Sequence, residues 1–178
     1  MSTTIVPMHQ LKRGLRQFRY LKGPRAFSSI ISTKLRQRAI VSSFICKPAQ
    51  SPGGLTFALF KRSKDVTTYP GKWAVCSGSI EASDSSPESA AQREISEETG
   101  LSVPEDIYLL RRGNPFSLVD EGLKTEWTIY PFAWELKPRA KSIKLGWEHT
   151  EVQFVKPAEL DKHDHVPLLE LGMKRVLD

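Results

Sequence analysis

This chain is constrained most by four ionised side chains within six residues, namely Arg93, Glu94, Glu97 and Glu98. Like-charged pairs at helical spacing each cost roughly 0.2–0.5 kcal/mol, so three neighbouring carboxylates need a compensating partner. Arg93 stands four residues before Glu97 and can orient one carboxylate with its planar guanidinium. A bound divalent cation would compensate the rest, and all-oxygen ligands favour Mg²⁺ or Mn²⁺ over zinc. The alternative is a solvated acidic face on a surface helix.

The surrounding residues predict a helix from Pro87 to about Thr99. Ser85 and Ser86 are suitable N-cap residues, and Ser85 has the spacing of a capping box with Glu88. Proline suits the first helical turn, and Gly100 stands where a left-handed residue would end the helix. Residues four apart share a face, so one face would be apolar and buried and another acidic: Ala91 with Ile95, and Glu94 with Glu98 and the adjacent Glu97.

This stretch resembles the Nudix box, G-x5-E-x7-R-E-U-x-E-E-x-G-U, in which U is a bulky apolar residue. The first half departs from the pattern, because Asp84 stands where the box has Glu and the following spacer is one residue longer. The extra residue falls in the loop before the helix, where insertions cost little. We expect Asp84 to place the same charge. The second half matches without exception: Arg93, Glu94, Ile95, Glu97, Glu98, Gly100 and Leu101.

The resemblance implies a Nudix-type α/β/α sandwich with a mixed β-sheet. It also implies a hydrolase that uses Mg²⁺ or Mn²⁺ to cleave a nucleoside diphosphate linked to another moiety. A narrower resemblance, to fungal Nudix domains, rests on S-G-S-I-E at residues 77–81 and W-E-H at residues 147–149. The partner would be a small diphosphate, whose second moiety the box does not identify.

Site roles carry over from the family position by position. Arg93 would orient the carboxylates. The general base would be Glu97 or Glu148, the latter in a late loop that often supplies a further carboxylate, and His149 is a weaker candidate. The metal ligands would be the carbonyl of Gly78 and the side chains of Glu94, Glu97, Glu98 and Glu148.

Three residues are candidates for substrate binding. Arg62 follows a strand where Nudix proteins often place a cation towards the phosphates, although such a residue can equally serve solubility at the surface. Trp73 could stack on a base or lie in the core. Trp127 belongs to an aromatic-rich segment in which alternation would bury about half of the rings.

The remaining pattern predicts an α/β domain over residues 35–178. Residues 166–177 predict an amphipathic closing helix. Cys46 and Cys76 fall inside apolar strands and are expected to be buried free thiols rather than a disulfide. Strands are expected over residues 38–46, 55–60, 73–77, 107–111, 115–119, 125–136 and 151–155.

The positive charge is concentrated at the N-terminal end. Residues 1–64 hold 13 of the 26 Lys and Arg residues and none of the 20 Asp and Glu residues. Residues 1–34 are rich in Arg and Ser, with apolar residues at helical spacing, and predict a mitochondrial presequence. Residues 25–28, R-A-F-S, resemble a matrix-peptidase cleavage site. The alternative is a basic tail that binds RNA or an anionic membrane, in a cytoplasmic protein.

Other classes of function receive less support. A Nudix-fold binding or regulatory module without turnover is favoured only by the departures in the first half of the box. A nucleic-acid-binding protein is disfavoured because all 20 acidic residues lie within residues 65–178, so no nucleic-acid partner is expected. No apolar run is long enough to predict a membrane span. The sequence does not indicate an oligomeric state.

Overall fold

The computed structural model describes residues 18–20, 35–49 and 54–177. The chain divides into two compact units, residues 1–38 with 117–128 and residues 39–116 with 129–178. Strands β2 and β8 contribute residues to both units. Apart from Phe18–Tyr20, the predicted presequence lies outside the described residues.

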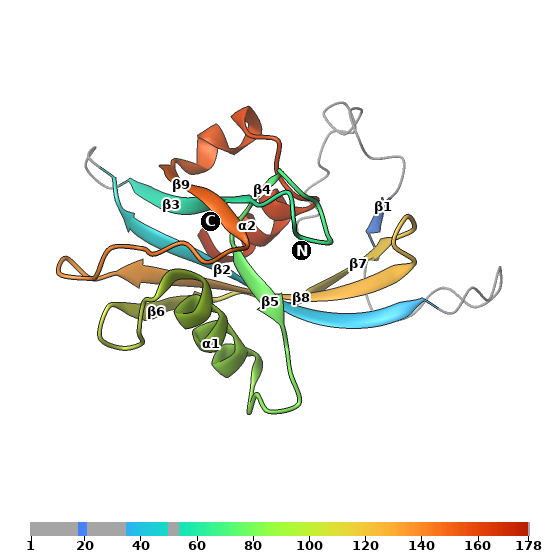
Figure 1. Cartoon of the computed structure of the whole chain (residues 1–178), viewed down its shortest axis with the longest axis horizontal. Helices are drawn as coiled ribbons and strands as arrows, with labels where there is room; N and C mark the ends of the chain where they lie inside the picture. Colours follow the sequence, from blue (N-terminus) through green and yellow to red (C-terminus); the bar gives the residue numbers. More distant parts are fainter. Residues whose placement is uncertain (1–17, 21–34, 50–53, 178) are drawn as a thin grey trace, which may run out of the picture. The chain divides into compact units, whose positions relative to one another are not determined.

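The larger unit is built on a β-sheet in which β8, β2, β3 and β4 are neighbours in that order. Strand β5 pairs with β2, β6 with β8 and β9 with β3, so no strand of this unit is left unpaired among the described residues. The strands are β2 (Arg36–Pro48), β3 (Leu55–Arg62), β4 (Trp73–Ala74), β5 (Cys76–Ser79), β6 (Ile107–Arg112), β8 (Thr125–Leu136) and β9 (His149–Val155), as Figure 1 shows.

The sheet has a hydrophobic core on each face because its strands are buried on both sides. Along β3, Ala58 and Phe60 point to one core, and Phe57 and Leu59 to the other, as the period of two in a strand requires. Helix α1 (Pro87–Thr99) covers the first core, and α2 (Leu169–Leu177) covers the second with the 3-10 helix η1 (Pro157–Lys162), as Figure 1 shows. The predicted α/β/α sandwich is therefore confirmed.

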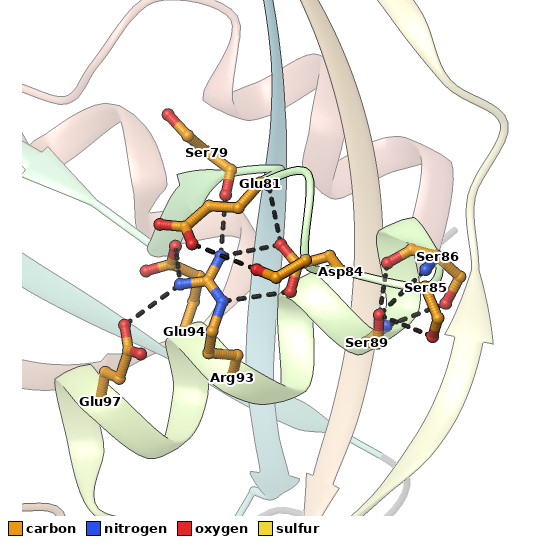
Figure 2. A network of polar contacts seen from close by, with 10 residues as sticks. Ser79, Glu81, Asp84, Ser85, Ser86, Ser89, Arg93, Glu94 and Glu97 are labelled. Carbon is orange, nitrogen blue, oxygen red and sulfur yellow. Dashed lines mark hydrogen bonds and ion pairs between the residues drawn. The ribbon is translucent and has the colours of Figure 1, made fainter.

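Helix α1 has the bounds that the sequence predicts, but its N-terminal cap differs in detail. Ser86 is the N-cap and forms a capping box with Ser89, so the predicted box of Ser85 with Glu88 is wrong (Figure 2). Ser86 directly precedes the first helical residue, Pro87, and has the extended backbone that a cap needs. Gly100 ends the helix at φ 70°, as predicted.

The C-terminal segment holds two differences from the prediction. The 3-10 helix η1 was not predicted, and α2 begins at Leu169 rather than at residue 166. Trp73 donates its backbone N–H to the Asp164 carbonyl at 2.9 Å, and Val166 donates to the Trp73 carbonyl at 2.8 Å. Because these bonds hold residues 164–166 beside β4, the helix starts only after Leu168, which has a left-handed φ of 57°.

Both cysteines are free and buried, as predicted. Desolvation raises the pKa of Cys46 to about 12, and it raises that of Cys76 well above its usual range. Within the described residues, no helix is long and apolar enough to cross a membrane.

The smaller unit contains β1 (Phe18–Tyr20), most of β7 (Phe116–Asp120) and the first part of β8. Strand β1 pairs antiparallel with β7, so Phe18–Tyr20 is not part of the helix that the apolar spacing of the N-terminal arm predicts. Isolated helical spacing cannot anticipate this pairing, because the partner strand lies about 100 residues further along the chain.

Candidate active site

The candidate site lies in the larger unit, where α1 packs against β5. Ala91 and Ile95 are fully buried in the core beneath the helix, as predicted, and this fixes the rotation of α1 about its axis. The side of the helix next to this buried face presents Glu94 towards β5, and Arg93 reaches the end of β5 and the loop that follows it (Figure 2).

Arg93 binds Asp84 through two parallel hydrogen bonds. Its Nε donates to Oδ1 at 3.1 Å and its Nη2 donates to Oδ2 at 3.0 Å (Figure 2). The Asp84 side chain is only 5% exposed. A bidentate pair of this kind fixes direction as well as distance. Hydrogen bonds from Arg93 lower the pKa of Asp84, which keeps this carboxylate ionised.

The same guanidinium reaches two glutamates of α1 and the end of β5. Nη1 donates to Glu94 Oε1 at 2.8 Å and to Glu97 Oε2 at 3.2 Å, and Nη2 donates to the Ser79 carbonyl at 2.9 Å. Figure 2 shows these groups arranged around one planar cation. Arg93 thus joins the helix, the strand and the inserted loop.

A glycine is required at position 78 because the Glu94 side chain lies very close to the backbone there. A Cβ at this position would lie 1.9–2.2 Å from the carboxylate atoms of Glu94, which is far inside van der Waals contact. The carboxylate of Glu94 therefore rests against the bare backbone of β5. Burial raises the pKa of Glu94 despite the opposing effect of Arg93.

Glu98 is a buried carboxylate with few hydrogen bonds. Its side chain is 8% exposed, and its Oε1 accepts a long hydrogen bond of 3.4 Å from the Ser77 backbone N–H. Its Oε2 has no hydrogen-bond partner among the described residues and lies 3.8 Å from His149 Nδ1, beyond hydrogen-bond distance. Desolvation, together with the charges of Glu94 and Glu148, raises the pKa of Glu98 to about 8. Such a group gains most from a cation.

The late loop brings Glu148 and His149 to the site. Gly146 donates its backbone N–H to the Glu98 carbonyl at 3.2 Å, and the Glu148 carbonyl accepts from the Ser63 N–H at 2.7 Å. His149 is 1% exposed in its side chain and packs beside Phe60, with 5.2 Å between ring centroids. Desolvation, with a smaller contribution from the charge of Arg62, lowers the pKa of His149 to about 4.

The donor chemistry of the site fits a hard divalent cation. Carboxylates and a backbone carbonyl are the ligands that Mg²⁺ and Mn²⁺ prefer, and the unpartnered oxygen of Glu98 is an acceptor that such an ion would satisfy. In the described part of the chain, however, no three His, Cys, Asp or Glu side chains are already grouped around one ion position. Glu94 and Glu97 instead face Arg93.

Each predicted substrate-binding residue has contacts within the protein. Trp73 is 9% exposed and packs in the core beneath α2, so the core alternative is the one observed and Trp73 is not a stacking residue. Arg62 donates from Nε to the Thr68 carbonyl at 2.9 Å and from Nη2 to the Thr68 hydroxyl at 3.2 Å. This holds the turn after β3. Trp127 belongs to the smaller unit and its indole N–H is buried.

Sequence reasoning missed the backbone contributions to the site. The Ser79 carbonyl and the Ser77 N–H both bind α1 side chains, yet backbone atoms leave no signal in residue types. The burial of His149 was also missed. Its position one residue after Glu148 in a polar loop gave no sign of it.

Comparison with known proteins gives a consistent result. Residues 37–176 match the NUDIX domain. The nucleoside triphosphatase NudI of Escherichia fergusonii is 28% identical over 138 residues, which cover 73% of this chain and 89% of NudI.

Two solved structures share the fold. A binary complex of a Caenorhabditis elegans Ap4A hydrolase superposes with a TM-score of 0.62 at 15% identity, over 78% of this chain and 93% of the hydrolase. The NUDIX domain of Shewanella oneidensis NrtR, complexed with ADP ribose, superposes with a TM-score of 0.56 at 17% identity, over 96% of each chain.

We expect Asp84→Asn to destabilise the protein at pH 7, measured as a lower urea midpoint. Because folding lowers the pKa of Asp84, its carboxylate stabilises the folded state fully at pH values above the unfolded-state pKa of about 4. This stabilisation is lost as the pH falls through the lower pKa of the folded state. The gap between Asp84→Asn and wild type should therefore narrow between pH 5 and pH 3.5. Asp164→Asn is the control, because the Asp164 side chain is 80% exposed in its pair with Lys72 and such pairs contribute little.

We expect Glu98→Gln to stabilise the protein in chelator. A carboxylate whose pKa rises from about 4.5 to about 8 on folding costs no stability below pH 4.5, and an increasing amount up to pH 8. The cost at pH 7 is about 3 kcal/mol, so the variant should gain about 1–3 kcal/mol there. Urea unfolding at pH 5, 7 and 8 measures this gain, and a gain independent of pH would contradict the assignment.

Proposed function

Because this chain belongs to the NUDIX domain family, we propose that it is a divalent-metal-dependent hydrolase that cleaves a nucleoside diphosphate linked to another moiety. Hydrolysis of a phosphoanhydride is the activity of the family. The observation that carries the proposal is the arrangement of the box: one guanidinium holds Asp84, Glu94 and Glu97, while beside them Glu98 is buried with an unpartnered oxygen. A folded chain tolerates such a cluster where a cation completes it.

The residues that would hold the metal are the Gly78 carbonyl and the carboxylates of Glu94, Glu97, Glu98 and Glu148. When bound, Mg²⁺ or Mn²⁺ neutralises phosphoryl oxygens and lowers the pKa of a bound water. Arg93 positions Glu94 and Glu97 and does not touch the reacting atoms. Asp84 in turn fixes Arg93 through the bidentate contact, which supports the proposal that Asp84 takes the place of the first Glu of the box.

The general base is Glu97 or Glu148. The side chain of Glu97 is 60% exposed, and that of Glu148 is partly exposed, so either can reach a water molecule. His149 is a poor alternative, because its ring is buried against Phe60 and has no access to solvent. A base must come within hydrogen-bond distance of the water that it activates.

The nature of the known relatives supports a nucleotide substrate. NudI is a nucleoside triphosphatase, the Caenorhabditis elegans protein is an Ap4A hydrolase, and the NrtR domain was solved with ADP ribose. All three names concern a nucleoside joined to a chain of phosphates. The narrower relation to fungal Nudix domains stays a prediction from residues 77–81 and 147–149.

A binding module without turnover is the competing proposal. Its support in the sequence was the departure from the box at Asp84 and in the spacer. Because Asp84 receives two hydrogen bonds from Arg93, the inserted loop is compatible with an intact carboxylate cluster. Hydrolysis is therefore the better supported of the two proposals.

We expect Glu97→Gln and Glu98→Gln each to lower kcat by roughly 10²–10⁴, the range for loss of a general base or of comparable charge. The assay is phosphate release from a panel of nucleoside diphosphate derivatives with Mg²⁺, with Mn²⁺ and in chelator. Glu88→Gln is the control on the same helix, since Glu88 pairs with Arg112 and not with Arg93. Activity of both variants within threefold of wild type would rule out these roles.

Mitochondrial import is a separate proposal, which rests on the acid-free arm of residues 1–34. We expect a C-terminal fluorescent tag to direct the full chain to mitochondria in yeast cells, and the mature protein to begin near Ser28. A variant without residues 2–27 should stay in the cytosol. A cytosolic full-length protein with an intact N-terminus would exclude import.

A further inference from the structure

Trp147 is an exposed indole beside the candidate active site. In the described part of the chain, four large apolar side chains are exposed: Tyr108, Leu110, Leu145 and Trp147. Three of them are 36–42% exposed, whereas Trp147 is 73% exposed. Of the other tryptophans of the larger unit, Trp73 and Trp134 lie in its cores.

The backbone on both sides of Trp147 is held in place. Gly146 donates its N–H to the Glu98 carbonyl at 3.2 Å and so ties the loop to the last turn of α1. The Glu148 carbonyl accepts from the Ser63 N–H at 2.7 Å and ties it to the end of β3. The exposed indole is therefore carried by an anchored backbone, in the segment that joins β8 to β9 (Figure 1).

Trp147 and Glu148 are the two central residues of one turn. His149 donates its N–H to the Gly146 carbonyl at 3.3 Å, which closes a four-residue β-turn. Beyond the turn, His149 is buried against Phe60. Consecutive Cα atoms lie about 3.8 Å apart, so the indole and the Glu148 carboxylate are attached to neighbouring points of the same turn. The turn packs on the end of α1, since a Cβ on Gly146 would lie 3.8–3.9 Å from backbone atoms of Glu97 and Glu98.

An indole in water has no stabilising role for the fold. A structural tryptophan would lose most of its exposed surface on folding, as Trp134 does. An aromatic side chain that stays exposed on a turn bonded to the last turn of α1 is suited instead to stack on a flat ring. Base stacking tolerates any nucleobase, because every base has a π-face.

We propose that Trp147 stacks on the nucleobase of the substrate and thereby makes the site selective for nucleoside diphosphates over diphosphates without a base. This inference rests on the proposed function, because it assigns the base-binding position of that same site. Trp147 replaces Trp73 as the stacking residue. It contributes to binding and takes no part in proton transfer.

The test compares Trp147→Ala, Trp147→Phe and Tyr108→Ala in the full chain. Tyr108→Ala is the matched control, since it removes another exposed aromatic ring, on β6. The ligands for calorimetry in Mg²⁺ are ADP and inorganic diphosphate, which share two phosphates and differ by the nucleoside. Steady-state kinetics on the best nucleotide of the panel separate KM from kcat.

We expect Trp147→Ala to weaken ADP binding and raise KM roughly 5- to 150-fold, the range for one stacked base. Binding of diphosphate and kcat should stay within about twofold. Trp147→Phe should recover most of the loss, and Tyr108→Ala should behave as wild type. Equal loss for ADP and diphosphate, or no loss for either, would overturn the proposal.

The two proposals fail in different ways. If no nucleotide is turned over but Trp147→Ala still weakens ADP binding selectively, hydrolysis is wrong and stacking holds. If turnover depends on Mg²⁺ and on Glu98 while Trp147→Ala leaves KM unchanged, stacking is wrong and hydrolysis holds.

Discussion

The contact between the Arg93 guanidinium and its surrounding carboxylates is the interaction on which the site depends. Without it, Asp84, Glu94 and Glu97 would repel one another in a partly buried place. The fork to Asp84 fixes the plane of the guanidinium, and Nη1 then lies within 3.2 Å of both glutamates. Hydrogen bonds to Asp84 in turn raise the pKa of Arg93, so the cation is permanent.

The arrangement has a cost that the rest of the larger unit must offset. Glu98 and His149 are both buried. Among the described residues, Oε2 of Glu98 and both ring nitrogens of His149 have no hydrogen-bond partner. Each such group costs free energy when it leaves water. The two cores on either face of the sheet supply the compensating burial, including Trp134, Phe44 and Phe60, which are fully buried. Functional sites often carry such an unfavourable free energy, which packing elsewhere in the fold offsets.

The loop between β8 and β9 contributes further residues to the site. Its backbone is bonded to α1 on one side and to β3 on the other, so it presents consecutive residues to different surroundings. Trp147 faces solvent, Glu148 stands near the carboxylates and His149 is buried beneath them. Adjacent residues of one anchored turn can therefore serve ring recognition and charge chemistry in the same site.

Local spacing in the sequence determined the parts of this protein that depend on neighbours in the chain. Strand-forming residues predicted most strands, although the strand expected over residues 73–77 is divided between β4 and β5. The cap and the C-terminal glycine predicted α1, and the second half of the box predicted that Glu94 and Glu98 share a helix face. Only the tertiary structure decided which tryptophan is buried. Neither the residue type nor the local sequence distinguishes Trp73 from Trp147, whereas the elements that pack over Trp73 bury it. It also decided that Asp84 reaches Arg93 across an extra loop residue, and that Phe18–Tyr20 pairs with β7. The physical reason is that helical and strand periods follow from local geometry, whereas burial and pairing depend on residues far away in the chain.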